Sequence, residues 1–222
     1  MRSSRIRAWS LAGLLAMLCL PCRAEDVAAT ARAVDAHYNA LKSFKAAFTE
    51  IYQAPGVSRT ESGTVWLKKP GRMRWEYRDP RPKLFVMDAQ NAYFYVPGDR
   101  QARKTSVKKL DDVRSPMRFL LGKAKLEKEL EGLSLAPDVA PLQAGNVVLR
   151  GKPKGMQDRI SSVLLEVSPD RQLLRIVVQG TDGSVTDFRF SQMEENVAVQ
   201  DSLFHFTAPA GVDTIQDAQA TQ

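Results

Sequence analysis

The chain has 222 residues, with 32 Lys and Arg against 25 Asp and Glu, and a formal net charge of +7. The charge is mild and the basic residues are interleaved with acids, so the composition does not favour a nucleic-acid-binding protein. Both cysteines, Cys19 and Cys22, lie near the N-terminus, so the remaining chain cannot use a disulfide, a cysteine nucleophile or a cysteine-ligated metal.

Residues 1–24 have the features of a secretory signal peptide. Three arginines precede the apolar run Leu11–Leu20, which is too short to span a bilayer comfortably, and Ala24 offers a small residue for cleavage. We expect cleavage after Ala24, which removes four arginines and lowers the net charge from +7 to +3. An uncleaved membrane anchor is the alternative. The predicted mature part, residues 25–222, is long enough for one domain stabilised by burial.

The first predicted element after the leader is an amphipathic helix over residues 26–41. Its apolar residues recur at spacings of three and four and form one stripe, made of Val27, Ala31, Val34, Tyr38 and Leu41. A period of two begins directly afterwards and predicts a strand from about 43 to 53, with Phe44, Ala46 and Phe48 on one side.

The stretch 63–80 predicts two strands joined by a bend. Pro70 presets its backbone angle and Gly71 tolerates a positive φ, so the pair favours a turn. In the second strand, three large apolar residues alternate with charged ones: Met73, Trp75 and Tyr77. A strand with one aromatic and one charged face is typical of the wall of a deep apolar interior.

Eight further strands are predicted from alternation and turn residues, at 83–88, 92–96, 100–107, 146–151, 160–168, 172–180, 184–193 and 203–206. In the strand at 92–96 both faces are apolar, as expected where a lid covers the sheet.

Helical segments are predicted from Ser115-Pro116 to Gly122, and over 124–131 with a stop at Gly132. Residues 208–213 are expected to form a turn, and the tail after Asp217 to fray.

These elements predict a mainly β (α+β) fold: a single half-open antiparallel β-barrel of about ten or eleven strands. The helices are amphipathic and must pack on the sheet, so we expect them to form a helical lid over a hydrophobic cavity. From composition alone, a fully packed core and a cavity that takes an acyl chain are both consistent with the many aromatic and Met residues on strands.

The sequence offers little for catalysis. It lacks the G-x-S-x-G, P-loop, H-E-x-x-H and G-x-G-x-x-G motifs. Its two histidines, His37 and His205, are far apart, and we expect each to be structural or to face solvent. We therefore expect no enzyme activity, no metal site and no cofactor.

The order and spacing of these motifs resemble the bacterial outer-membrane lipoprotein carrier family, the periplasmic LolA-like carriers of the Lol pathway. The family pattern S-F-x-A-x-F-x-Q is matched by 43–50, and G-x-L/V-W-V/L-K-R/K-P by 63–70. Three more motifs are matched, by Met73-Arg74-Trp75, by Ser115-Pro116 with Leu120-Leu121, and by 204–213, where the pattern is F-x-F-x-x-P-x-G-V-D. The likeness covers nearly the whole predicted mature chain.

Two positions depart from that pattern. Lys69 stands where the best-known carriers have an Arg, which is thought to hydrogen-bond lid backbone and so set the balance of closed and open states. Lysine keeps the charge but loses the planar fork and several donors. Glu50 stands where the pattern has Gln, a change for which the sequence offers no explanation.

The resemblance implies a periplasmic carrier that takes acylated lipoproteins from an inner-membrane ABC transporter and hands them to an outer-membrane receptor. The family likeness and the strand faces together place the acyl-chain cavity at seven residues: Tyr38, Phe48, Met73, Trp75, Met117, Leu120 and Leu121. The resemblance implies a lid latch at Lys69. We expect a monomer that binds no nucleic acid.

The main alternative is a carrier or sensor of the same fold for another lipid, such as a glycolipid. A lipid hydrolase is more distant. A receptor-like lipoprotein is disfavoured because neither Cys19 nor Cys22 follows the small-residue triplet that bacterial lipid attachment needs.

Overall fold

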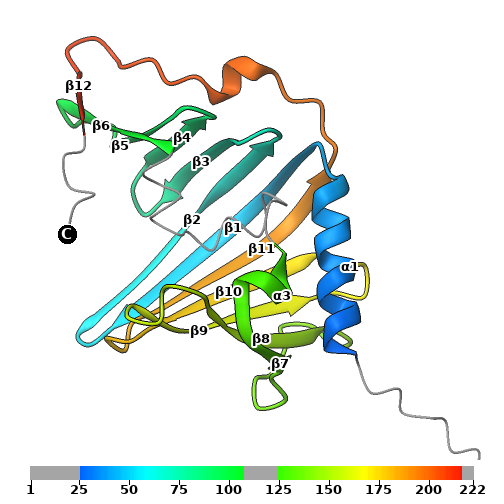
Figure 1. The fold of residues 1–222 in the computed structure, drawn as a ribbon. Coiled ribbons are helices and arrows are strands. Elements are labelled where there is room, and N and C mark those ends of the chain that lie inside the picture. Colours follow the sequence, from blue (N-terminus) through cyan, green and yellow to red (C-terminus); the bar gives the residue numbers. More distant parts are fainter. Residues whose placement is uncertain (1–25, 108–124, 217–222) are drawn as a thin grey trace, which may run out of the picture.

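The computed structural model describes residues 26–107 and 125–216. The predicted leader 1–24 and the predicted lid residues Met117, Leu120 and Leu121 lie outside the described residues. The described residues form one twelve-stranded sheet, in the order β12-β6-β5-β4-β3-β2-β1-β11-β10-β9-β8-β7. The sheet is open, with β12 and β7 at its edges, and Figure 1 shows it bent into a half-barrel with α1 and α3 against one face.

The described residues form twelve strands, two α-helices and one 3₁₀ helix. The strands are β1 (Ser43–Ala54), β2 (Val57–Lys68), β3 (Arg72–Asp79), β4 (Lys83–Asp88), β5 (Asn91–Tyr95), β6 (Gln101–Ser106), β7 (Leu130–Leu135), β8 (Val147–Pro153), β9 (Ile160–Val167), β10 (Leu173–Gly180), β11 (Val185–Glu195) and β12 (Asp213–Gln216). The helices are α1 (Val27–Ala40), α3 (Leu126–Glu129) and the 3₁₀ helix η2 (Asp201–Phe204).

The predicted fold class is confirmed, with two differences. The described sheet has twelve strands where ten or eleven were expected. In addition, β12 pairs with β6 in parallel, while the other pairings in the sheet are antiparallel. Alternation had predicted only a turn at 208–213, because β12 is short and its residues are exposed on both faces.

The helix predicted over 124–131 is wrong in extent. Only Leu126–Glu129 is helical, and the chain continues directly into β7, which pairs with β8. The local sequence favours helix, but the open edge of β8 offers backbone partners that outweigh this propensity. Gly132 does not stop a helix: it has a φ of +61° at an irregularity in the β7–β8 register.

The strand predicted at 203–206 is also wrong. Residues 196–212 cross the face of the sheet that α1 does not cover (orange in Figure 1), so they pack through side chains instead of pairing. Phe204 is fully buried in η2, and the ring of Phe206 lies 5.1 Å from that of Tyr93. This C-terminal segment therefore packs on the face of the strand predicted at 92–96 that carries Tyr93 and Tyr95.

The helix α1 packs its apolar stripe onto the opposite face, which we call the inner face. Asp26 caps its N-terminus by accepting hydrogen bonds from the amides of Ala28 (3.0 Å) and Ala29 (3.2 Å). The predicted stripe is confirmed, because Ala31, Val34, Tyr38 and Leu41 are buried and Val27 is partly buried, all in one core cluster with the inner face. Within the described residues, no helix is long and apolar enough to cross a membrane.

Candidate functional site

Four of the predicted cavity residues meet in one apolar cluster on the inner face. Tyr38 reaches it from α1, Phe48 from β1, and Met73 and Trp75 from β3. Each side chain is buried, with at most 4% of its residue surface exposed. The fold brings these residues together because β1, β2 and β3 are consecutive neighbours in the sheet and each strand turns alternate residues inward.

Aromatic rings make up the centre of this inner face. The ring of Phe48 lies 4.6 Å from Trp75 and 4.9 Å from Tyr77, each edge to face. Phe188 and Phe190 of β11 complete the group, with ring centres 5.9 and 6.3 Å from Trp75. The sequence analysis did not select these two phenylalanines, although they alternate within a predicted strand. Their selection needed the pairing of β1 with β11, which joins segments far apart in the chain.

Polar contacts fix the C-terminal half of α1 over the sheet. The buried Tyr38 hydroxyl accepts a hydrogen bond from the Leu173 amide of β10 at 2.9 Å. Burial raises the pKa of this phenol well above its usual value, so it stays neutral. His37 Nε2 lies 2.9 Å from the Glu195 carboxylate of β11, and Asp35 accepts the Leu126 amide of α3 at 3.1 Å. Helix α1, which covers the inner face and which we call the roof helix, is therefore held by polar contacts to both β10 and β11.

We predict that Tyr38→Phe lowers the free energy of unfolding by about 1–2 kcal/mol, because the Leu173 amide is left without its buried acceptor. The aromatic packing of Tyr38 on Phe44 is retained. Urea unfolding measures the effect. Tyr52→Phe is the control, since its ring lies under an exposed Arg59 guanidinium and its loss of a hydroxyl should cost little. Equal effects of the two substitutions would contradict the assigned role of the Tyr38 hydroxyl.

Lys69 holds the end of α1 from the β2–β3 turn. Its ammonium group donates to the Tyr38 carbonyl and to the Asn39 carbonyl (3.0 Å). Both carbonyls lie in the last turn of α1, where carbonyl groups have no partner within the helix. A cation at a helix C-terminus also complements the helix dipole. Burial lowers the pKa of this lysine. The residue expected to act as a latch thus contacts backbone of the roof helix.

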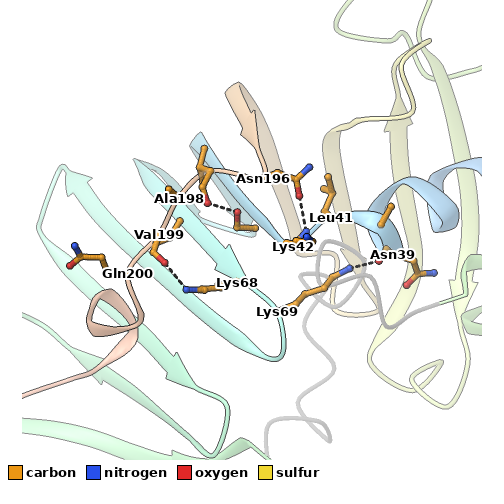
Figure 2. A pocket seen from close by; sticks show the side chains of 12 residues that line it. Asn39, Leu41, Lys42, Lys68, Lys69, Asn196, Ala198, Val199 and Gln200 are labelled. Atoms are coloured by element: carbon orange, nitrogen blue, oxygen red, sulfur yellow. Dashed lines mark hydrogen bonds between the residues drawn. The ribbon is translucent and has the colours of Figure 1, made fainter.

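A pocket with both apolar and charged lining residues opens beside Lys69. It has a volume of about 820 Å³ and lies between the end of α1, the start of β1, the end of β2 and residues 196–200 (Figure 2). Lys42, Lys68 and Lys69 line it together with backbone, and Lys68 donates to the Val199 carbonyl. The four predicted cavity residues that the structure describes do not line this pocket. In the described arrangement they are covered, and the pocket lies where α1 meets the sheet.

Glu50, which departs from the family pattern, has a hydrogen-bond partner on the inner face. Its side chain lies on the inner face two residues beyond Phe48, and its carboxylate accepts the hydroxyl of Tyr77 at 2.8 Å. Burial, followed by the charge of Glu50, raises the pKa of Tyr77. The carboxylate therefore serves as the hydrogen-bond acceptor for a largely buried phenol.

The two histidines fit their expected roles. His37 is half-buried and paired with Glu195, and His205 is exposed directly after η2. The residues described here contain no group of three or more His, Cys, Asp or Glu side chains placed to hold a metal ion. The site is a buried apolar surface of the sheet, covered by a helix that hydrogen bonds hold in place.

Comparison with known proteins gives a consistent result. The family model "Outer membrane lipoprotein carrier protein LolA" matches residues 39–207. A protein of Nitrosospira multiformis named outer-membrane lipoprotein carrier protein is 31% identical over 76% of this chain and 79% of its own. One of the same name from Dechloromonas aromatica is 30% identical over 84% of this chain and 89% of its own. Among solved structures, a LolA superfamily protein from Nitrosomonas europaea is 14% identical, with a TM-score of 0.46 over 82% of this chain and 99% of that one.

Proposed function

Because this chain belongs to the LolA family of outer-membrane lipoprotein carrier proteins, we propose that its inner face binds the acyl chains of lipoproteins in the periplasm. The protein is a carrier and not an enzyme. We further propose that it receives lipoproteins from an inner-membrane ABC-type transporter and delivers them to an outer-membrane receptor. Export would depend on the leader 1–24, cleaved after Ala24.

The observation that carries the proposal is the continuous apolar inner face, which α1 covers. Tyr38, Phe48, Met73 and Trp75 belong to one cluster that extends from α1 across β1 and β3 to β11. Apolar surface of this extent binds alkyl chains by the hydrophobic effect, which is not directional and accepts chains of varied structure. Met73 adds a flexible, polarisable wall. We propose that acyl chains reach these residues when α1 moves away from the sheet.

The energetics of a shuttle set a limit on how much of each chain is buried. A buried methylene is worth about 0.8 kcal/mol, so full burial of three long acyl chains would exceed the practical ceiling of about 20 kcal/mol for a complex. A carrier with so large a binding energy could not release its cargo without an energy source. We therefore propose partial burial, with a receptor whose cavity is slightly more favourable.

The Lys69 contacts with α1 lead to a prediction for release. Lys69→Leu removes the ammonium donor from the Tyr38 and Asn39 carbonyls, so the balance of closed and open states changes while the apolar face remains intact. We expect normal folding and acyl binding but a several-fold lower rate of lipoprotein transfer to receptor-containing membranes. Lys69→Arg restores a cation with more donors and should keep transfer near wild type.

The matched control is Lys42→Leu, which removes another lysine of the same pocket. Lys42 hydrogen-bonds through its backbone, to Asn196 and to the Lys69 amide, and leucine keeps both of these bonds. Transfer rates for Lys69→Leu that match those of Lys42→Leu would remove the latch role.

Two measurements test the function itself. Mass spectrometry of material extracted from protein purified from its own periplasm should show acylated lipoprotein. A glycolipid in its place would support the related carrier or sensor of another lipid. Purified protein added to inner-membrane vesicles with an active transporter should release newly made lipoprotein into the soluble fraction. Absence of both acylated cargo and release would overturn the proposal.

A further inference from the structure

On β1 to β4, the apolar inner face gives way to a row of polar and charged side chains. Along β1 the inward side chains are Phe44, Ala46 and Phe48 and then Glu50. Figure 1 shows that β1 runs away from the C-terminal end of α1. Glu50 is in register with Glu61 of β2. On the next strands, Tyr77 of β3 is in register with Lys83 of β4. We call Glu50, Glu61, Tyr77 and Lys83 the polar band.

The polar band is joined by direct contacts. Lys83 Nζ donates to Glu61 Oε2 and lies 4.4 Å from the centre of the Tyr77 ring. Tyr77 in turn donates its hydroxyl to Glu50. Glu61 is buried, with 6% of its surface exposed, and Arg59 also pairs with it at 3.1 Å. Two carboxylates side by side on neighbouring strands would repel each other, so Lys83 and Arg59 are needed to balance them.

We propose that the polar band is the end stop for the acyl chains and so determines which chain lengths this carrier prefers. The inference rests on the proposed function and specifies the cargo that it accepts. Methylenes that lie over Phe48 and Trp75 leave water for an apolar surface. Methylenes pushed further would displace water from Glu50 and from the Glu61–Lys83 pair, and removing charged groups from water is unfavourable. Chain length beyond the band therefore adds no affinity.

Glu50 is the residue on which this stop depends most directly. In the β1–β11 pairing Glu50 is in register with Phe188, and Phe48 with Phe190. A leucine at position 50 would lie beside Phe188. It would extend the inward apolar row of β1 beyond Phe48 by one position, which is about 7 Å along the strand. Glu61 would keep its pairing with Lys83 and Arg59.

The test is a competition among saturated lysophosphatidylcholines of graded chain length, from about 12 to about 20 carbons. The full-length protein, purified after export, is incubated with an equal mixture, and bound lipids are quantified by extraction and mass spectrometry. For the wild type we expect occupancy to rise by about fourfold per methylene up to one length, the factor that about 0.8 kcal/mol represents at 25 °C, and to stop rising there. For Glu50→Leu we expect the rise to continue to longer chains.

Two variants control for other effects. Glu50→Gln keeps a polar group and an acceptor for Tyr77, so its length limit should stay close to that of the wild type. Glu194→Leu makes the same substitution at an exposed position paired with Lys45, and should not change the profile. A Glu50→Leu that binds lipid with the wild-type length limit would overturn the end stop. A wild type that binds none of these lipids would instead count against the proposed function.

Discussion

Replacing Gly63 by alanine is expected to lower the free energy of unfolding by about 3 kcal/mol, the upper end of the range for overpacking. A Cβ atom at this position would lie 1.8 Å from the Glu76 carbonyl oxygen and 2.9 Å from the Tyr77 Cα. Both contacts are with backbone of the neighbouring strand, which cannot turn away as a side chain could. The β2–β3 pairing would have to separate where the register already shifts between Ser62 and Gly63.

Urea unfolding followed by tryptophan fluorescence measures this effect. The control is Gly98→Ala, where the φ of +99° makes alanine strained but no atom lies within 4 Å of the added Cβ. That strain alone costs on the order of 1–2 kcal/mol. A loss for Gly63→Ala no greater than for Gly98→Ala would mean that the β2–β3 pairing relaxes easily around residue 63.

Trp75→Ala is expected to have the largest effect among the inner-face residues, about 3–5 kcal/mol. Trp75 is 3% exposed. Its ring packs against four aromatic neighbours, and each of them would lose a packing contact: Phe48, Tyr77, Phe188 and Phe190. The neighbouring rings come from β1, β3 and β11, and their strands cannot all move inward to fill the space. We also expect bound acyl lipid to be retained less well, because the centre of the apolar face is lost.

The chain supplies a matched control in Trp66. It lies in β2 on the opposite face, is only half-buried, and is in register with Arg74. Trp66→Ala should therefore destabilise clearly less than Trp75→Ala and leave lipid binding unchanged. Chemical unfolding and the lipid extracted per mole of protein are measured for both variants. Equal losses for the two tryptophans would contradict the distinction between an inner and an outer face.

The alternation of apolar and charged residues predicted most of the sheet and the residues of β1 and β3 that share its inner face. A side-chain period of two tells which residues of a strand share a face, so Phe48, Met73 and Trp75 could be placed together from the sequence. Tyr38 followed from the period of α1, and the Lys69 contact came from the family likeness. Met117, Leu120 and Leu121 lie outside the described residues and stay a prediction.

The errors occurred where a segment depends on distant partners. Residues 130 and 131 were predicted to end a helix but begin β7, which pairs with the edge of β8. Residues 203–206 alternate like a strand but cross the outer face. Phe188 and Phe190 became part of the site through the pairing of β1 with β11. None of these outcomes is encoded in local periodicity, because each is decided by the available backbone or apolar surface elsewhere in the chain.

The sequence by itself determined the class of the fold, the inward residues of its central strands and the roof helix, since local spacing decides which side chains share a face. The family likeness implied that Lys69 is a latch, but only the tertiary structure showed that its partners are the Tyr38 and Asn39 carbonyls of α1. Only the tertiary structure decided that Glu50 accepts the hydroxyl of Tyr77. It also placed Glu61 beside Lys83, which completes the polar band beside the apolar part of the inner face. These contacts join residues 22 to 31 positions apart, and their energies depend on strand register and burial, which no local pattern specifies.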